Sequence, residues 1–386
     1  MKYKMPITKN DDKYNIRIIT GTNHLTEIAK EWESVLENDA SYHPYLTSEW
    51  YNMWLEHFIS STDFKVLMFY RDNVLKMIVP LISNNKRYRG TDVRIQKLAG
   101  NVYMPIKSII TNASSEDMPG LIRAFIDYLH KSVDEWDIID FDDLPAEESW
   151  VEAFCAEIKR PTFKTKSYDC FGNWYSDEIN GSSKDYMDKR SKNFRASIKK
   201  NYKKLQQSGE VVFKLVTGEH DCPDYFTLYN EVYSRSWKKE ERVGRTFFPE
   251  MVRYAERNGW LRVGLLFLDG TPVGAGFAIV TGGRAYFEKI AYDEKYKGFG
   301  AGSVCLYEMI RHVIDVDSVS TIDFLRGDDE YKRHWVDKRR VRKGIMIYNN
   351  NLRGKYLSLI DNSVLPMINR NKTIRKIKET VAKSMR

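Results

Sequence analysis

Two segments of the sequence share one hairpin pattern, and this repetition constrains the fold more than any other feature. Each segment has two apolar runs joined by a turn dipeptide: Asp72-Asn73 within residues 64–82, and Asp269-Gly270 within residues 261–280. Because Asp, Asn and Gly tolerate the positive φ of tight turns, both segments are predicted to be β-hairpins. An Ile-Asp-Phe strand and then a helix follow each hairpin, with 68 and 54 residues between the turn Asp and the strand Asp. The shared order predicts two copies of one α/β unit.

Strands alternate with helices throughout the second copy. This pattern predicts an α/β fold (α+β, with mixed sheets), in which helices cover the faces of the sheet. The expected helices are 223–238, 247–258, 303–315 and 329–336, and the expected strands are 260–268, 272–280, 284–292, 319–325 and 341–349.

Residues 182–209, between the copies, predict one long amphipathic helix. Its apolar residues recur at helical spacing and form one stripe: Met187, Phe194, Ile198, Tyr202 and Leu205. Nine basic and two acidic residues fall within 184–204, so the remaining faces are positive. They form either a solvated surface or a surface that attracts phosphate or a polyanion. The expected division is a first unit at 1–180, this basic helix at 181–209, a second unit at 210–352 and a basic tail at 353–386.

The positive charge of the chain is concentrated in few places. The net charge is +8, yet residues 353–386 alone hold nine basic and two acidic residues. A uniformly basic nucleic-acid binder is therefore disfavoured, and the tail is expected to dock on the body, to be disordered, or to lie on an anionic membrane surface. No apolar run approaches the roughly 18–20 residues of a membrane span, and no secretory signal begins the chain, so a cytoplasmic protein is expected. The spacing of the four cysteines and seven histidines predicts no metal site.

A glycine-rich loop follows the predicted strand 284–292. It reads Lys297-Gly298-Phe299-Gly300-Ala301-Gly302, and a helix is predicted from Ser303. Such a strand–loop–helix junction presents backbone amides and a helix N-terminus to an anion, which suits a pyrophosphate, although it is also an ordinary connection. It matches neither a Walker loop nor the dinucleotide fingerprint.

The pattern Lys297-x-x-Gly300-x-Gly302 resembles the acyl-CoA pyrophosphate loop of the GNAT superfamily of N-acyltransferases, with Lys where that family usually has Arg or Gln. Residues 40–350 resemble the CelD-like branch of tandem GNAT units, which is related to the FemABX-like peptidyltransferases. The matching words are 43–50 (HPYLTSEW), the basic stretch 189–204, Lys289-x-x-Tyr292-Asp293, and 324–335 with its Phe-Leu-Arg-Gly-Asp start. The resemblance implies an acyl-CoA donor such as acetyl-CoA, held by Tyr292, Lys297, Gly298, Phe299, Gly300, Ala301, Gly302 and Ser303. Residues 97–105 of the first copy lack such a loop and are expected to bind no CoA.

The same resemblance implies the catalytic candidates. A tyrosine on the helix after the fifth strand often protonates the leaving thiolate in GNAT enzymes, and Tyr331 lies in the matching stretch. Glu288 and Asp328 are candidate bases that would take a proton from the acceptor ammonium. The alternative roles are a packing tyrosine and surface ion pairs. If strand 284–292 alternates regularly, Glu288 shares a face with Tyr286, Ile290 and Tyr292.

Several residues are candidates to bind phosphates or an acidic acceptor near the same site: Lys289, Arg326, Lys332 and Trp335. For the cations the alternative is structural ion pairing. For Trp335 and Trp237, the alternative to a functional role is packing in the core or in a pocket wall.

These features predict an N-acyltransferase that acts on an amine of a sugar, a nucleotide-sugar or an amino-acid-derived acceptor, and the resemblance points to envelope or exopolysaccharide biosynthesis. The enzymatic alternative is FemABX-like transfer from aminoacyl-tRNA, with RNA held by the basic helix. The non-enzymatic alternative is an interaction protein built from decayed units.

Overall fold

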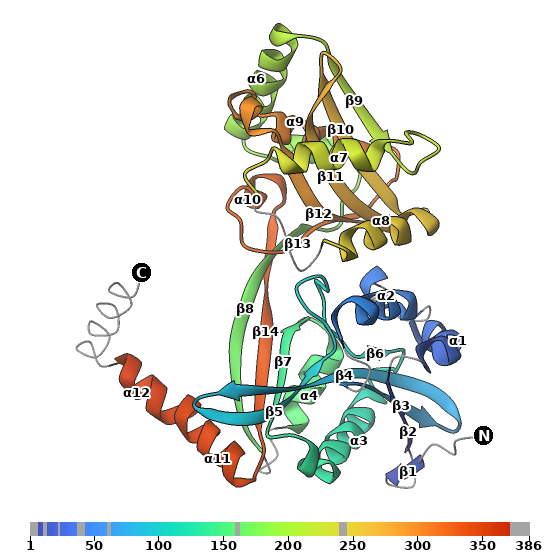
Figure 1. The fold of residues 1–386 in the computed structure, drawn as a ribbon, viewed down its shortest axis with the longest axis vertical. Helices are drawn as coiled ribbons and strands as arrows, with labels where there is room; N and C mark the ends of the chain where they lie inside the picture. Colours follow the sequence, from blue (N-terminus) through green and yellow to red (C-terminus); the bar gives the residue numbers. More distant parts are fainter. Residues whose placement is uncertain are drawn as a thin grey trace. The chain divides into compact units, whose positions relative to one another are not determined.

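The computed structural model describes residues 7–10, 14–21, 24–36, 43–59, 63–158, 163–238 and 245–370, which form two compact units (Figure 1). Unit 1 consists of Met1–Cys170 and Val341–Arg386, and unit 2 of Phe171–Arg340. The chain passes from one unit to the other within β8 (Lys164–Ser176) and again within β14 (Lys338–Tyr348).

Unit 1 is a mixed sheet with helices. Its strands pair in the order β1-β2-β3-β4-β5-β7-β14, with β6 beside β4. The bounds are β1 Ile7–Asn10, β2 Tyr14–Thr20, β3 Phe64–Arg71, β4 Val74–Tyr88, β5 Thr91–Leu98, β6 Ile110–Thr111 and β7 Ile138–Leu144. The helices are α1 Leu25–Leu36, α2 Ser48–Phe58, α3 Met118–Lys131 and α4 Ser149–Glu157, with α11 Leu352–Leu359 and α12 Leu365–Arg370 after the last strand.

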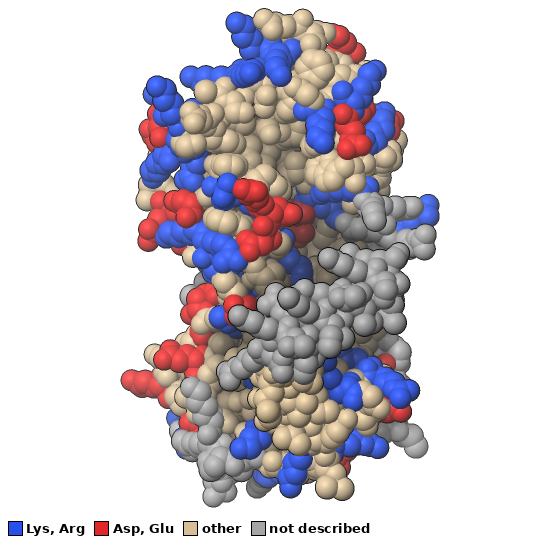
Figure 2. Space-filling model, turned by 90° about the vertical axis from the view of Figure 1, so that its left-hand side faces the viewer, with Lys and Arg blue, Asp and Glu red and all other residues tan. Residues whose placement is uncertain are grey.

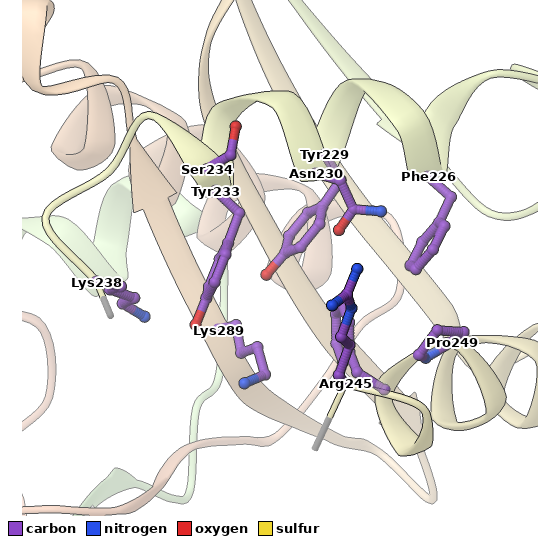
Figure 3. Close-up of a pocket in the computed structure, with 10 residues that line it drawn as sticks. Phe226, Tyr229, Asn230, Tyr233, Ser234, Lys238, Arg245, Pro249 and Lys289 are labelled. Carbon is purple, nitrogen blue, oxygen red and sulfur yellow. The ribbon is translucent and has the colours of Figure 1, made fainter. Parts of the chain in front are cut away.

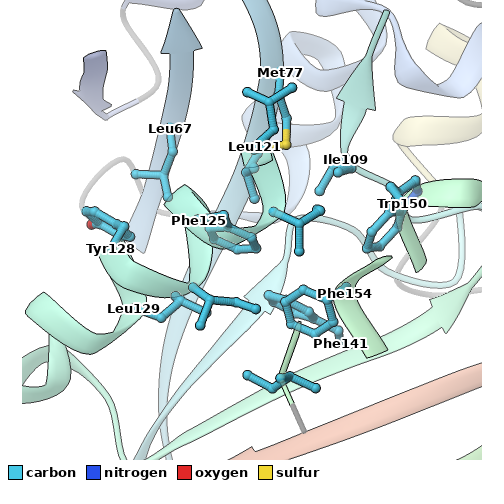
Figure 4. Packing of buried hydrophobic residues seen from close by; sticks show 14 of the residues in the cluster. Leu67, Met77, Ile109, Leu121, Phe125, Tyr128, Leu129, Phe141, Trp150 and Phe154 are labelled. Carbon is cyan, nitrogen blue, oxygen red and sulfur yellow. The ribbon is translucent and has the colours of Figure 1, made fainter. Parts of the chain in front are cut away.

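The core of unit 1 forms where α3 and α4 cover the sheet (Figure 4). Residues four apart on α3, Leu121, Phe125 and Leu129, lie on one helical face and are fully buried. Phe125 packs at 6.2 Å between ring centroids on Phe141 of β7 and at 6.0 Å on Phe154 of α4. Aromatic contacts of this kind anchor the helices to the strands.

Unit 2 has a sheet of the same design. Its strands pair in the order β9-β10-β11-β12-β13-β8. The bounds are β9 Val211–Val216, β10 Leu261–Leu268, β11 Thr271–Thr281, β12 Arg284–Tyr292 and β13 Thr321–Arg326. The helices are α5 Ser183–Asp188, α6 Lys192–Ser208, α7 Tyr225–Ser234, α8 Phe247–Arg257, α9 Ala301–Asp315 and α10 Lys332–Trp335.

Helices cover both faces of the unit 2 sheet (Figure 1). A Cβ at Gly274 of β11 would lie 3.2 Å from Cys305 of α9, so the even-numbered residues there face α9. The adjacent odd-numbered Phe277 contacts Phe248 of α8, with 5.5 Å between ring centroids. The α9 face and the α7/α8 face are therefore opposite sides of one sheet.

The predicted duplication agrees with the strand order of the two units. Both predicted hairpins form, as β3–β4 and β10–β11, and their turn residues have positive φ: 50° and 62° at Asp72-Asn73, 48° and 75° at Asp269-Gly270. In each unit the next strand then pairs in parallel with the Ile-Asp-Phe strand, β5 with β7 and β12 with β13. The strands and helices expected in the second half are confirmed, with ends that move by a few residues.

The strand that completes each unit comes from the other half of the sequence. β14 pairs antiparallel with β7 of unit 1, with Ile347 opposite Ile139, while β8 pairs antiparallel with β13 of unit 2. Residues 171–180 therefore belong to unit 2, and 341–352 to unit 1, which differs from the expected boundaries at 180 and 352. The local pattern of a strand does not specify its partner, because pairing is decided by residues far away in the chain.

The basic connecting segment forms two helices instead of one. Ser182 caps α5 through a capping box, and Ser191 caps α6 by accepting a hydrogen bond from the Phe194 amide at 3.2 Å. A serine in this position ends one helix and begins the next, because its hydroxyl satisfies an amide that has no acceptor within the helix. The expected apolar stripe is retained, since Ile198 and Leu205 are buried in the core of unit 2.

The start of the basic tail docks on unit 1. Asp361 has no exposed surface and accepts hydrogen bonds from the hydroxyls of Tyr88 and Tyr348, at 2.7 and 2.9 Å, and from Arg89 Nε at 2.9 Å. Residues 371–386 of that tail lie outside the described residues. Within the described ranges, no helix has the length and apolar character needed to cross a membrane.

Candidate functional site

The strand β12 contains a β-bulge at the first candidate base. Phe277 of β11 lies opposite Lys289, while Ala278 lies opposite Phe287, so Glu288 is the extra residue between two paired positions. A bulge shifts the alternation by one residue. The expected common face is therefore wrong for Tyr286, which lies opposite Ile279 on the α7/α8 face. Ile290 and Tyr292 do share a face, since they lie opposite Gly276 and Gly274 on the α9 side.

The strands β12 and β13 separate just beyond the start of their pairing. They are paired at three positions, the last being Tyr286 with Asp323, and then continue to Tyr292 and Arg326. In the described part of the chain, the β12 edge beyond Tyr286 has no strand partner on this side. Backbone amides and carbonyls at such an edge can hydrogen-bond an extended polar ligand.

The predicted glycine-rich loop follows β12 and leads into α9. Residues Glu294–Phe299 form a short 3-10 helix, and Gly300 is the N-cap of α9 with φ 68°. Gly300 has no side chain to cap the helix, and the Ser303 amide donates to the Gly300 carbonyl at 3.0 Å. The amides of Ala301 and Gly302 precede the first intrahelical bonds, at the end where the helix dipole favours an anion. Lys297 and Gly298 are exposed, Phe299 and Ser303 are half-buried, and Ala301 is buried.

The three glycines of the loop have different structural roles. Gly300 has a left-handed backbone and lies against the Asn201 side chain, which occupies the space of a Cβ. A Cβ at Gly302 would lie 2.6 Å from the ring of Tyr292. Only Gly298 of the three has no atom within 4 Å of the position that a Cβ would take, so it faces open space. The missing side chain of Gly298 therefore leaves open space, whereas those of Gly300 and Gly302 leave room for protein atoms.

The basic helix α6 lies beside this loop. The Lys204 ammonium donates a hydrogen bond to the carbonyl of Gly298 at 3.0 Å. Figure 2 shows blue side chains over the part of unit 2 at the level of α6, and the exposed lysines of that helix are Lys192, Lys199, Lys200, Lys203 and Lys204. Positive charge is therefore placed next to the first amides of α9.

Aromatic side chains hold the strand end that leads into the loop. The Trp237 and Tyr292 rings are 4.4 Å apart between centroids, and Trp237 remains 49% exposed. Arg235 Nε pairs with the Asp293 carboxylate at 3.0 Å, and Asp293 accepts a hydrogen bond from the Lys295 amide. Trp237 is therefore not a core residue; it lies at the surface and contacts the strand end before the loop.

Tyr331 lies immediately before α10, and its phenol is suited to remain protonated. Its ring is 45% exposed and packs edge-on against Phe324, with 6.4 Å between centroids. Partial burial of the phenol and the nearby Asp329 carboxylate raise the pKa of Tyr331 above its usual value of about 10. A phenol in this state can donate a proton at neutral pH.

Asp328 is engaged in an ion pair. Its carboxylate accepts hydrogen bonds from Arg339 Nε at 2.8 Å and Nη2 at 2.5 Å, and from the Trp174 indole at 2.8 Å. The Arg339 hydrogen bond and then the Trp174 hydrogen bond lower the pKa of Asp328 to about 2. A carboxylate with so low a pKa is a poor proton acceptor at neutral pH, which leaves Glu288 as the better candidate base.

Lys332, one of the expected substrate-binding residues, is surrounded by acceptors of the protein itself. Lys332 is 5% exposed, and its ammonium contacts the carbonyls of Phe324, Arg326 and Gly327 at 2.9–3.2 Å and the Asp329 carboxylate at 3.2 Å. These contacts use all three of its donors, and burial lowers its pKa. Lys332 thus shapes the turn after β13 and does not face a ligand.

Trp335 belongs to the core, the other alternative for that residue. It is 2% exposed and packs edge-on against Phe194 of α6, with 4.8 Å between ring centroids. Arg326 is exposed, and its guanidinium lies 4.1 Å from the ring centroid of Phe171. The hydrophobic core that contains Trp335 also contains Ala301 of the loop, and Phe299 packs against it.

A strained backbone at the end of β13 was not predicted from the sequence. Leu325 has φ 52°, which is unfavourable for a leucine by about 1–3 kcal/mol. Its amide donates to the Asp323 carboxylate at 2.7 Å, and its carbonyl accepts from the Asn173 side chain at 2.9 Å. Asn173 comes from β8, so no local sequence signal could have indicated this arrangement. The bend begins where β13 leaves β12.

Comparisons with known proteins agree with this geometry. Residues 192–333 match the family described as an acetyltransferase (GNAT) domain. The structure is similar to FemX, with a TM-score of 0.60 and 11% identity over 86% of this chain and 98% of that chain. It is also similar to the C-terminal domain of a putative lysylphosphatidylglycerol synthetase from Agrobacterium fabrum, with a TM-score of 0.51 and 11% identity over 88% and 97% of the two chains. No curated protein matches the chain by sequence.

The chain therefore carries a GNAT acetyltransferase domain, which includes α6, the bulged strand β12, the loop and α9. The fold is α/β with GNAT-like units, and the class of activity that this domain defines is acyl transfer.

The Lys332→Met variant tests whether this residue is structural. We expect the free energy of unfolding in urea to fall by roughly 1–3 kcal/mol, because buried carbonyls lose their donor. Arg333→Met is the matched control: Arg333 makes a surface ion pair with Glu330, which contributes about 0–1 kcal/mol. A Lys332→Met variant as stable as the wild type would show that Lys332 is not a structural residue.

Proposed function

We propose that this chain is an N-acyltransferase that moves an acyl group from acyl-CoA, with acetyl-CoA as the simplest donor, to the amine of an acceptor. The observation that supports this most strongly is the junction of three features within unit 2: the bulge of β12, its separation from β13, and the glycine-capped start of α9. Together they offer an open strand edge for an extended thioester arm and the first amides of α9 for its pyrophosphate.

The residues proposed to hold the donor are those around the loop. The amides of Gly298, Ala301 and Gly302 would bind phosphate oxygens, and Lys297 would add a positive charge from the exposed side, while the Gly300 and Ser303 amides hold the turn by donating to the carbonyls of Lys297 and Gly300. Tyr292 would shape the loop from behind, through its contact with Gly302. Unit 1 differs at the corresponding place: no register shift interrupts the β4–β5 pairing, and Lys97 pairs with Asp140 at 2.9 Å beside the parallel pairing of β5 and β7. This difference supports a single donor site, in unit 2.

The proposed reaction is direct attack without a covalent enzyme intermediate. Glu288 would take a proton from the acceptor ammonium, directly or through water. The neutral amine then forms the new C–N bond at the thioester carbonyl, and the C–S bond breaks. Tyr331 would give its phenolic proton to the leaving thiolate, in keeping with its raised pKa.

The acceptor class that we propose is an amine on a sugar, a nucleotide-sugar or an amino-acid-derived molecule, in envelope or exopolysaccharide biosynthesis. Its support is the resemblance of the sequence to the CelD-like branch. A cytoplasmic reaction, with the basic tail as a candidate membrane contact, is the setting that we propose for it.

Gly298→Asp tests the donor site. Since a Cβ at Gly298 would have no atom within 4 Å, the backbone accommodates the substitution, and the new carboxylate would repel the pyrophosphate. We expect the affinity for CoA and acetyl-CoA to fall at least about tenfold by isothermal titration, because like charges about 4 Å apart repel by roughly 1–4 kcal/mol near a protein surface.

Gly298→Asn is the matched control for that test, since Asn has almost the same shape without the charge. It should bind CoA within about threefold of the wild type. Equal affinities of the Asp and Asn variants, or no CoA binding by the wild type, would overturn the assignment of the donor.

Tyr331→Phe tests the proposed general acid. We expect kcat to fall by about 10²–10⁴-fold, the usual contribution of a positioned acid, while the affinity for acetyl-CoA stays unchanged. The measurement is CoA thiol release with glucosamine as the acceptor. Because the pKa of Tyr331 is raised, the wild type should lose no activity through this group as the pH increases from 7 to 10. Tyr307→Phe, on α9, is the control, and a Tyr331→Phe enzyme with normal kcat would contradict the role.

The second candidate function is transfer of an aminoacyl group from charged tRNA. Its specific support is the row of exposed lysines on α6 next to the loop, because RNA binding depends on contacts between cations and phosphates.

Replacement of Lys199, Lys200 and Lys203 by Gln distinguishes the two functions. If tRNA is the donor, binding should weaken steeply with salt, and the triple variant should lower the log–log salt slope by about 2–3. A control triple variant at Lys86, Lys131 and Lys164 of unit 1 should leave that slope unchanged. If acyl-CoA is the donor, as we propose, the wild type shows no specific tRNA binding in this experiment.

A further inference from the structure

The helices that follow the last strand of unit 1 expose apolar side chains. Eleven large hydrophobic side chains are exposed among the described residues, and five of them belong to α11, α12 and the π-helix Ile360–Val364 between these helices. They are Leu352, Tyr356, Leu359, Val364 and Met367, with exposed fractions of 87, 48, 58, 39 and 72%. Single exposed apolar side chains are ordinary, but five that share one short segment indicate an interaction surface.

These five side chains form a single stripe along the helical segment, the C-terminal stripe. Leu352, Tyr356 and Leu359 are spaced four and three residues apart, which places them within an arc of about 60° on an α-helix. The next step, from Leu359 to Val364, is five residues long and crosses the π-helix, where hydrogen bonds connect residues five apart. Val364 therefore stays in line with the stripe, and Met367 follows three residues later. In a continuous α-helix the same step would turn Val364 away by about 140°.

The opposite face attaches the helical segment to unit 1. Leu357 is fully buried in a small core with Ile138 and Tyr348, and Asp361 has no exposed surface. The Asp361 carboxylate accepts hydrogen bonds from Tyr88, Tyr348 and Arg89, as described above for the start of the tail. A surface helix normally buries its apolar face. Here the contacts with unit 1 bury a carboxylate and leave the C-terminal stripe in solvent.

Positive charge borders the stripe at the turn of the β4–β5 hairpin. The Tyr356 hydroxyl donates a hydrogen bond to the Arg89 carbonyl at 3.4 Å, so the stripe reaches this turn (Figure 1). The turn end of the hairpin carries three exposed cations and one exposed carboxylate: Lys86, Arg87, Arg89 and Asp92. The stripe is therefore bordered by a surface with an excess of positive charge.

The helical segment and the sequence after it add further cations. Arg353 and Lys355 are exposed on α11, and Arg353 lies 3.8 Å from the Asp137 carboxylate. Asp361 is the only acidic residue in 352–370, and its burial leaves the solvent-facing charge of the segment positive. Residues 371–386 contain six basic and one acidic residue. An apolar stripe bordered by cations is typical of a helix that lies in the plane of an anionic membrane surface.

The stripe differs in shape from the cavity of about 640 Å³ that lies beneath α7 in unit 2 (Figure 3). Apolar side chains that line a cavity are shielded by its walls, as is Tyr229, which is 2% exposed. Leu352 and Met367 instead project mostly into solvent. A projecting stripe does not enclose a small molecule, but it can enter a broad, soft surface such as the headgroup layer of a bilayer.

A second copy of the chain fits this surface less well, because the charges around the stripe have mainly one sign. In a twofold pair the same surfaces face each other, which would bring Lys355 and the hairpin cations of both copies together. Anionic headgroups neutralise these cations, while the apolar side chains enter the boundary with the acyl chains. Tyr356 suits that boundary, since its ring is apolar and its hydroxyl is polar.

We propose that the C-terminal stripe and the cations of the β4–β5 hairpin form a docking surface for a bilayer that contains anionic phospholipids. The helical segment lies in the plane of the membrane, with the stripe in the headgroup layer and the cations beside it. The attachment is peripheral and reversible, because five apolar side chains enter only the outer part of the bilayer. This gives a location to the membrane contact proposed for the basic tail, and it uses no residue of the acyl-transfer site.

Flotation of the full chain with vesicles tests the proposal. One set of vesicles contains equal parts of phosphatidylcholine and phosphatidylglycerol, and the other contains phosphatidylcholine alone. At physiological salt we expect binding to the anionic vesicles to be at least about tenfold tighter, because each cation near an anionic surface adds to the attraction. Equal binding to the two sets, or binding to neither, overturns the proposal.

A triple variant of the stripe locates the apolar contact. It combines Leu352→Gln, Leu359→Gln and Met367→Gln. The matched control changes three exposed valines in other parts of the chain: Val74→Gln, Val102→Gln and Val316→Gln. We expect the stripe variant to bind anionic vesicles at least about tenfold more weakly, and the control to stay within about threefold of the wild type. All six positions are exposed, so both variants should keep the wild-type Tm. Equal affinities of the two variants overturn the proposal.

A second triple variant tests the cations. It combines Lys86→Gln, Arg87→Gln and Lys355→Gln, and its control combines Lys30→Gln, Lys184→Gln and Lys214→Gln, which are exposed elsewhere. We expect the first to weaken binding to anionic vesicles about tenfold or more and to leave binding to neutral vesicles unchanged. The control removes the same charge, so an equal loss in both variants would show non-specific attraction and overturn the proposed surface.

Oligomeric state and CoA binding distinguish the remaining outcomes. A wild-type dimer that the stripe variant dissociates, together with no vesicle binding, would assign the stripe to a second copy of the chain and overturn the proposal. Affinity for acetyl-CoA should be the same in all variants. Loss of vesicle binding with intact CoA binding confirms that the two sites are separate. Absence of CoA binding by the wild type refutes the proposed donor and not the membrane surface.

Discussion

The separation of β12 from β13 is the constraint on which the candidate site depends. The two strands pair over three positions and then part; beyond that point β12 has an extra residue at Glu288, and β13 has a left-handed backbone at Leu325. A regular sheet would satisfy its own backbone groups along that edge, and no donor could bind there. The bulge also sends Lys289 to the α7/α8 face.

Hydrogen bonds from side chains around the turn stabilise the bend of β13. Asn173 and Asp323 hydrogen-bond the backbone of Leu325, and the Lys332 ammonium donates hydrogen bonds to the carbonyls that follow it. Arg339 and Trp174 hold Asp328 as an anion. Charged residues near a site are therefore not all reactive. In this turn they maintain a conformation, so Tyr331 and Glu288 remain the proposed groups for proton transfer.

The two units share one architecture and differ at the place of the candidate site. Both have the hairpin, the parallel pair and the covering helices. Only unit 2 combines the bulged strand with the glycine-capped helix, whereas in unit 1 Lys107 is 4% exposed and pairs with Asp142 and Asp143 at 2.7 and 3.0 Å. Buried ion pairs of this kind stabilise only when their partners are all present. Unit 1 is thus suited to a supporting role.

Much of the fold could be predicted from the sequence, because its signals are local. The turn dipeptides at 72–73 and 269–270, the alternation of strands and helices, and the position of the loop at 297–302 all depend on neighbouring residues, and the structure agrees with them. The sequence also placed Tyr331, Glu288 and Lys289 among the candidates. It could not distinguish them from Lys332, Asp328 and Trp335, since a charged or aromatic residue has the same sequence signal whether it is exposed or held by partners.

The tertiary structure alone decided the rest. The exchange of β8 and β14, the bulge that reverses the faces of β12, the strain at Leu325 and the cavity beneath α7 all arise from residues far apart in the chain. The sequence by itself determined a duplicated α/β architecture and a loop suited to phosphate, because turns and helix starts are set by a few adjacent residues. Which side chains face a ligand was decided by long-range pairing, because burial and hydrogen-bond partners exist only once the distant strands meet.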